Sequence, residues 1–211
     1  YQDAVAPALE ALRLLGHPIE LEYDMEYVGR EVQRVFVLAG EKGGIANLAF
    51  LDECDDPRYR MTSNILLDTV PLAYLLGHFS LYCMVSVFTV NLTLKHGLMP
   101  ASSEGFALFG FVASSFFEHQ KEGGEMCQLS ERLVTSGQVG PNHISRSLIH
   151  AGLGGQWGTS HKIATTWLER AIHSGVKCGD VHTASYSCAE YAEFCVISGQ
   201  PLHYINAFTK E

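Results

Sequence analysis

The apolar stretch at residues 79–117 constrains the fold more than any other feature of this chain. Its first part predicts a helix, because apolar side chains recur at steps of four, three and four residues, the spacing of one helical stripe. Gly97 and Pro100 are expected to end that helix, and Ser102 or Ser103 to cap the next one. The second helix, about 103–117, is apolar on all sides, so we expect it to lie buried between other helices. The residues of the first stripe are Leu81, Val85, Phe88 and Leu92.

Signals for helix starts recur in the second half of the chain at intervals of about 40 residues, a period typical of stacked helix pairs. Each interval is expected to contain two helices, separated by a glycine-rich or proline-marked turn at 123–124, 152–158 or 199–201. A pair cannot cover its own apolar face, so each pair must pack on the next. We therefore predict an all-α fold of stacked antiparallel helix pairs that form a right-handed tetratricopeptide-like α-solenoid. The predicted pairs are 103–118 with 122–136, 143–153 with 159–174, and 181–198 with 201–209.

Residues 1–60 form an acidic segment before this array, with 12 of the 23 acidic side chains of the chain and 6 of its 14 basic ones. After an acidic turn, a further helix is predicted at 59–76, where Pro71 should kink or break it. We expect one helical-repeat domain over 1–211, with 61–211 as the main helix-pair array, and we expect the chain to be a fragment of a longer protein. The helices predicted within the acidic segment are 4–15, 26–39 and 45–51.

The charge of the chain argues against a nucleic-acid partner, and its hydropathy argues against membrane insertion. The formal net charge is −9, and the clusters of Lys and Arg that bind phosphate are absent, which disfavours nucleic acid. The longest apolar run, 79–94, has 16 residues and contains five Ser, Thr or Asn, whereas a membrane span needs about 20 apolar residues. The six cysteines form no CxxC pair and no secretory segment is visible, so we expect free thiols and a cytoplasmic protein without membrane insertion.

Two clusters of residues suggest chemistry, but a structural interpretation is favoured for both. His173, Cys178, His182 and Cys188 lack the close ligand pairs of a structural zinc site. The glycine-rich segment 152–158 follows a helical pattern instead of the strand that a dinucleotide-binding fold requires, so it is predicted to be a helix–helix turn. No motif with a catalytic mechanism is present. We expect no catalytic residue, no cofactor and no metal.

Three groups of residues resemble the helical region of very large multidomain sensor kinases. They are Ala11-Leu12-Arg13-Leu14-Leu15-Gly16, then Asn91-Leu92-Thr93-Leu94-Lys95-His96-Gly97 with 100–103 and 105–110, and Ala171-Ile172-His173-Ser174-Gly175 with Gly179-Asp180. Proteins of this family combine a serine/threonine-kinase-like domain, an AAA ATPase, a helical region, a GAF domain and a histidine kinase, in bacteria and as hybrid kinases in fungi. The resemblance implies a tetratricopeptide-like segment that couples an ATPase module to kinase modules in two-component signalling. It carries over no catalytic residue.

The sequence therefore predicts a non-catalytic scaffold for protein interaction and signal coupling, with protein partners or neighbouring domains of the same chain. Helix phase suggests that Ser147, His150, Tyr186 and Glu190 project from the concave side formed by the first helices of the pairs. The alternative is a helical protein that binds a small molecule or a metal and has an enzymatic role. A narrower hypothesis is redox sensing through the thiols near turns, Cys54 or Cys178.

Overall fold

The computed structural model describes residues 2–201, 203 and 205. Helix accounts for 78% of the described residues, which contain no strand, and this confirms the predicted all-α class. The helices in chain order are α1 (Gln2–Leu14), α2 (Met25–Glu41), the 3₁₀ helix η1 (Ile45–Phe50), α3 (Pro57–Leu75), α4 (Phe79–His96), α5 (Ser102–Phe116), α6 (Gln120–Thr135), α7 (Pro141–Gly158), α8 (His161–Cys178) and α9 (Val181–Ile197).

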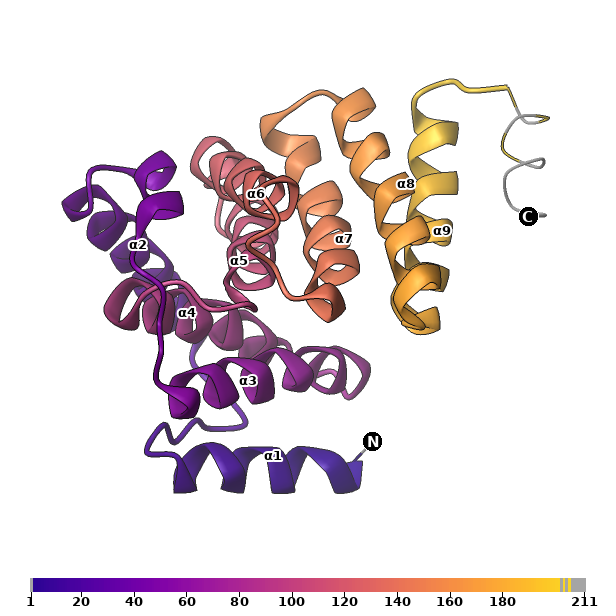
Figure 1. Cartoon of the computed structure of the whole chain (residues 1–211). Coiled ribbons are helices and arrows are strands. Elements are labelled where there is room, and N and C mark those ends of the chain that lie inside the picture. Colours follow the sequence, from indigo (N-terminus) through magenta and orange to yellow (C-terminus); the bar gives the residue numbers. More distant parts are fainter. Residues whose placement is uncertain (1, 202, 204, 206–211) are drawn as a thin grey trace.

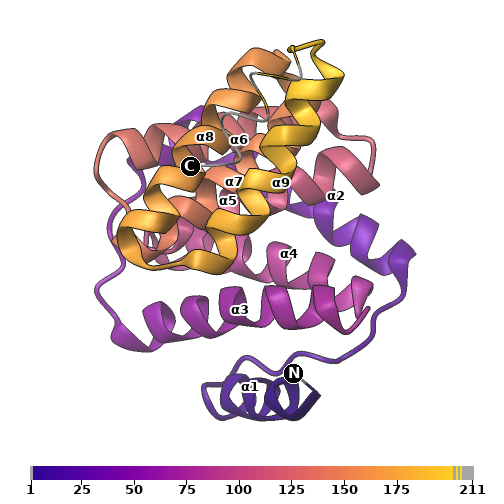
Figure 2. The same cartoon turned by 90° about the vertical axis from the view of Figure 1, so that its right-hand side faces the viewer.

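The helices form two groups that cross each other. Helices α5 to α9 stand side by side in chain order, whereas α1, α3 and α4 lie crosswise beneath them (Figures 1 and 2). Within the upright group each helix packs on the next, and α7 also contacts both α5 and α9. Helix α4 joins the two groups because it packs on α3 and on α5.

The predicted interval of about 40 residues is present, because α5, α7 and α9 begin at 102, 141 and 181, which are 39 and 40 residues apart. Local signals explain these boundaries. Pro141 opens α7, and the side chain of Asp180 accepts a hydrogen bond from the Thr183 amide at the start of α9. Gly179 ends α8 with a φ of 80°, in the left-handed region that glycine adopts without strain.

Helix α5 occupies the centre of the molecule. Twelve of its 15 residues are buried, and it packs against α4, α6 and α7. This confirms the prediction that a helix apolar on all sides lies between other helices. Phe106 and Phe109 on α5 are fully buried and belong to the larger core cluster, which extends to Val28 on α2 and Met126 on α6.

The predicted turns at 123–124 and 152–158 are wrong, because these glycines lie inside α6 and α7. Their missing side chains allow helices to approach closely. A Cβ atom on Gly124 would lie 2.6 Å from the Cα of Gly158, and one on Gly154 would lie 2.7 Å from the Cα of Phe111 on α5. Glycine-rich sequence here therefore indicates close helix packing. The predicted turn at 199–201 follows α9, as expected.

Two smaller predictions also need correction. The break predicted at Pro71 is wrong, because α3 is continuous from Pro57 to Leu75, whereas the kink stays a prediction. Ala101 precedes α5 in place of a serine cap, and Ser102 Oγ instead accepts a hydrogen bond from the Met99 amide. The helix predicted at 201–209 falls largely outside the described residues.

Candidate functional site

An open groove of about 450 Å³ lies between α3 and the helices α7 and α9, and we call it the α3–α9 groove. Tyr82 of α4 and Glu104 and Phe111 of α5 complete its lining. Both views place α3 beneath the upright helices (Figures 1 and 2). The groove therefore runs along the junction of the two groups of helices, on the side formed by α3, α5, α7 and α9.

Three helices each contribute a stripe of side chains to this groove. The spacing within each stripe is helical, with steps of one, three or four residues, so each stripe is one face of its helix; Leu72 of α3 lines the groove outside this spacing. Helix α3 contributes mainly apolar side chains, and α7 and α9 add polar groups to theirs. The stripes are Leu67, Val70, Pro71, Tyr74 and Leu75 on α3, Arg146, Ile149, His150 and Leu153 on α7, and His182, Thr183, Tyr186 and Glu190 on α9.

Several large apolar side chains at the groove are exposed to solvent. Tyr74 is 63% exposed, Leu75 40% and Tyr186 38%. Isolated exposed apolar side chains are ordinary in monomers, but here they converge on one concave surface. Such a surface is the usual site at which a protein binds a ligand or a partner.

A buried pair links α5 to α7 at the bottom of the groove. His143 Nδ1 and Glu104 Oε2 share a hydrogen bond of 2.6 Å, and Glu104 is only 1% exposed. Burial raises the pKa of Glu104 above its usual range, while the hydrogen bond with His143 and the positive charge of Arg146 act in the opposite direction. A buried carboxylate requires such partners, so the pair fixes the position of α7 on α5.

Arg146 joins three helices at the same end of the groove. Its Nη1 donates to Asp68 of α3 at 2.9 Å, and its Nε donates to Asp180, the cap of α9, at 3.3 Å. Burial alone would raise the pKa of Asp180, but hydrogen bonds from Thr183 and the charge of Arg146 hold it below its usual range. This network positions α3, α7 and α9 around the groove.

Three of the four residues predicted to bind a partner line the groove: His150, Tyr186 and Glu190. Their role in binding stays a prediction. The prediction that Ser147 projects from the same surface is wrong, because its side chain is fully buried. Ser147 Oγ donates to the carbonyl of His143 at 2.6 Å and forms a hydrogen bond with Ser103 of α5.

Of the charged residues of the groove, Glu190 was predicted from the sequence, but Glu104 and Arg146 were not. Glu104 is the only acidic residue in α5, and Arg146 is the only Lys or Arg in α7. A single charged residue in a helix that is otherwise expected to be buried must have a partner, because an unpaired charge is costly away from water. That signal was present for Glu104, but it does not reveal which residues act as the partners.

The stability of the protein should depend on the protonation of His150. Burial lowers the pKa of His150 to about 4, whereas the unfolded chain has the ordinary value of about 6.5. The folded state therefore binds fewer protons between these values, and its stability is complete above about pH 6.5 and declines as the pH falls toward 4. Because the side chain keeps some exposure, we expect a contribution of about 1–2 kcal/mol.

Urea unfolding at several pH values tests this expectation against His150→Leu. The change in packing caused by the substitution does not depend on pH. The difference between the two proteins in the slope of unfolding free energy against pH therefore reports the protonation of His150. Glu104 is present in both proteins, and its raised pKa makes stability increase as the pH falls, which is the opposite sign. We expect the free energy of unfolding of the variant to fall less steeply between pH 6.5 and 4. Identical slopes would contradict the assignment.

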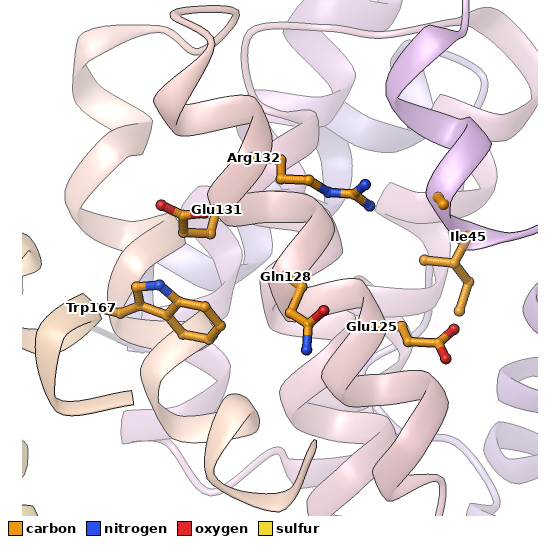
Figure 3. Close-up of a pocket in the computed structure, with 7 residues that line it drawn as sticks. Ile45, Glu125, Gln128, Glu131, Arg132 and Trp167 are labelled. Carbon is orange, nitrogen blue, oxygen red and sulfur yellow. The ribbon is translucent and has the colours of Figure 1, made fainter. Parts of the chain in front are cut away.

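A second depression, of about 370 Å³, lies on the side formed by η1, α6 and α8. Figure 3 shows Gln128 between Trp167 and Glu125, with Arg132 above Gln128 and Ile45 next to Glu125. Four of its seven lining residues are charged or polar, and one of these, Glu131, is already paired with Arg170. The α3–α9 groove is larger and has more apolar side chains in its lining, so it is the stronger candidate.

The other clusters do not form a site. Within the part of the chain that the structure describes, no three His, Cys, Asp or Glu side chains are grouped as metal ligands, so the segment 173–188 contains no assembled zinc site. Cys54 is buried and Cys178 is exposed, which leaves Cys178 as the accessible thiol of the two. No helix in the described residues has both the length and the hydropathy that crossing a membrane requires.

Comparisons with protein-family models, with curated proteins and with solved structures find no match for this chain. The groove is therefore the feature of the structure that bears on function.

Proposed function

We propose that this chain is a non-catalytic scaffold that binds a protein partner, or a neighbouring domain of the same protein, in the α3–α9 groove. The observation that carries the proposal is the convergence of three helical stripes on one open groove with exposed apolar side chains. Tyr186 of α9 lines the groove, and tyrosine is among the residues that most often dominate the energy of protein interfaces.

We further propose that the helix pairs α5–α6 and α7–α8, followed by α9, form a right-handed tetratricopeptide-like solenoid. Its support is the interval of 39 and 40 residues between first helices and the packing of α7 on both α5 and α9. Stacked pairs of this kind present their first helices on a concave binding surface. The groove is lined by α5, α7 and α9, the first helices of the predicted pairs.

The place of this scaffold in a cell is also a proposal. The resemblance to the helical region of large sensor kinases favours a role in a cytoplasmic two-component signalling protein. In such a protein the groove would receive a segment of an adjacent kinase or ATPase module, and a change in occupancy would transmit the signal. Mass action then couples binding in the groove to the stability of the helix array.

Tyr186→Ala is expected to weaken binding of groove-directed peptides by about ten-fold or more. The probe is a displayed library of random peptides of about 15 residues, from which binders of the wild-type chain are selected and their Kd values measured by fluorescence anisotropy. Thermal unfolding should change little, because Tyr186 is 38% exposed. Phe50→Ala is the control, since Phe50 is 82% exposed on η1 and lies outside the groove. Equal affinity of all three proteins for the selected peptides would contradict the proposal.

The volume of the groove also lies within the range of small-molecule sites, about 300–1,000 Å³. A small apolar ligand is therefore the second candidate. A thermal-shift screen with nucleotides and small apolar compounds distinguishes the two, because a ligand that binds only the folded state raises Tm by mass action. A compound that raises Tm and displaces the selected peptides would favour the small-molecule function.

A further inference from the structure

The shape of the α3–α9 groove selects the secondary structure of its occupant. The stripe on α3 runs from Leu67 to Leu75 and the stripe on α9 from His182 to Glu190, so each covers eight residue steps, or about 12 Å along its own helix, and α3 lies crosswise to α9. These walls are helices, whose backbone groups are already bonded internally, so they offer no free strand edge to an extended peptide. A helix satisfies its own backbone and needs only an apolar face to fill the groove.

The charges of the groove select the chemistry of that occupant. Glu190 is partly buried in the lining, and no ion pair to it occurs among the described residues. Burial raises the pKa of Glu190, and the neighbouring charge of Glu193 acts in the same direction. The carboxylate of Glu190 thus loses solvation without gaining a cation, and a positive charge from a partner would relieve this cost.

No other cation of the groove serves this purpose. Arg146 is the only Lys or Arg in the lining, and it is engaged by Asp68 and Asp180. The lining also holds Glu104 and Asp180, so its acidic side chains outnumber the single Arg146. A groove with this excess attracts a basic segment and repels an acidic one.

We infer that the α3–α9 groove binds an amphipathic helix of about two to three turns, supplied by a partner protein, whose apolar face carries a lysine or arginine that pairs with Glu190. This inference rests on the proposed function. The apolar positions of the helix, spaced three or four residues apart, contact Tyr74, Leu75 and Tyr186, and its cation lies at the Glu190 end of the groove.

The test uses the whole chain and the displayed library of about 15-residue peptides. Peptides enriched on the wild-type chain are expected to share apolar positions at helical spacing and a Lys or Arg at one common position. Glu190→Gln should weaken their binding by about ten-fold, since a charge-assisted bond is lost. Selection on Glu190→Lys should instead enrich Asp or Glu at that position. Glu169→Gln is the matched control, because Glu169 is also partly buried but lies on α8, outside the groove.

The outcomes separate this inference from the function on which it rests. Peptides that lose affinity with Tyr186→Ala but not with Glu190→Gln would overturn the charge pairing and leave the groove as a binding site. Failure to enrich any peptide whose binding depends on Tyr186 would overturn both. Self-association of the wild-type chain that is abolished by Glu190→Gln would identify a second copy as the occupant and would also contradict the inference. Circular dichroism and thermal unfolding of each variant show that the fold is retained.

Discussion

Replacing Phe109 by alanine is expected to lower the free energy of unfolding by about 3–5 kcal/mol. Phe109 is fully buried on the central helix α5, and its ring meets that of Phe36 on α2 edge to face, with 5.2 Å between the ring centroids. The loss combines the transfer free energy of the side chain with the cost of the cavity that remains. The cavity cannot collapse easily, because α5 is held by α4, α6 and α7. Urea unfolding followed by circular dichroism measures the effect.

Phe50→Ala is the matched control, since it removes the same side chain from a position that is 82% exposed on η1. We expect its free energy of unfolding to stay within about 0.5 kcal/mol of the wild-type value. If Phe109→Ala cost no more than this control, α5 would not be the centre of the core, and the arrangement of the other helices around it would be wrong.

The position of α5 in the core was predictable from the sequence for a physical reason. A helix with apolar side chains on every face is stable only when other helices cover all of those faces. The ends of the helices were predictable for a similar reason. Gly97 and Gly179 occupy positive φ at or next to the ends of α4 and α8, and Asp180 caps α9. Each of these signals acts within a few residues, so the sequence alone contains the information.

The groove was predictable only in part, because helix phase states which residues share a face but not what that face meets. Ser147 and His150 lie three residues apart on α7 and so share a side of the helix. In the structure Ser147 packs on Ser103 of α5, whereas His150 reaches the groove. The face of α7 that lines the groove contains His150 together with Arg146, Ile149 and Leu153, and it does not include Ser147.

The charged network of the groove could not have been predicted from local patterns. The hydrogen bond between His143 and Glu104 joins residues 39 positions apart, and that between Arg146 and Asp68 joins residues 78 positions apart. Periodicity carries no information over such distances. Only the three-dimensional packing of α3, α5 and α7 decides which charges meet.

The glycines of α7 show how one residue type supports two opposite interpretations. Glycine permits positive φ in a turn, and it also removes the side chain where two helices must come close. The composition of the segment 152–158 predicts a turn, but in the structure its glycines allow two helices to come close. A Cβ atom on Gly154 would lie 2.7 Å from both the Cα of Phe111 and the Sγ of Cys127. The α5 backbone at Phe111 cannot withdraw as a flexible side chain could.

Gly154→Ala is therefore expected to lower the free energy of unfolding by about 1–3 kcal/mol, although alanine is the better helix former. Gly40→Ala is the control with the opposite expected sign. Gly40 lies in the last turn of α2, is exposed, and has no neighbouring atom within 4 Å of the place that an alanine Cβ would take, so alanine should stabilise the protein by about 0.5–1 kcal/mol. Urea unfolding of both variants measures the difference in sign. Stabilisation by both substitutions would mean that α5 and α7 do not approach at Gly154, and that 152–158 forms the turn that its composition predicts.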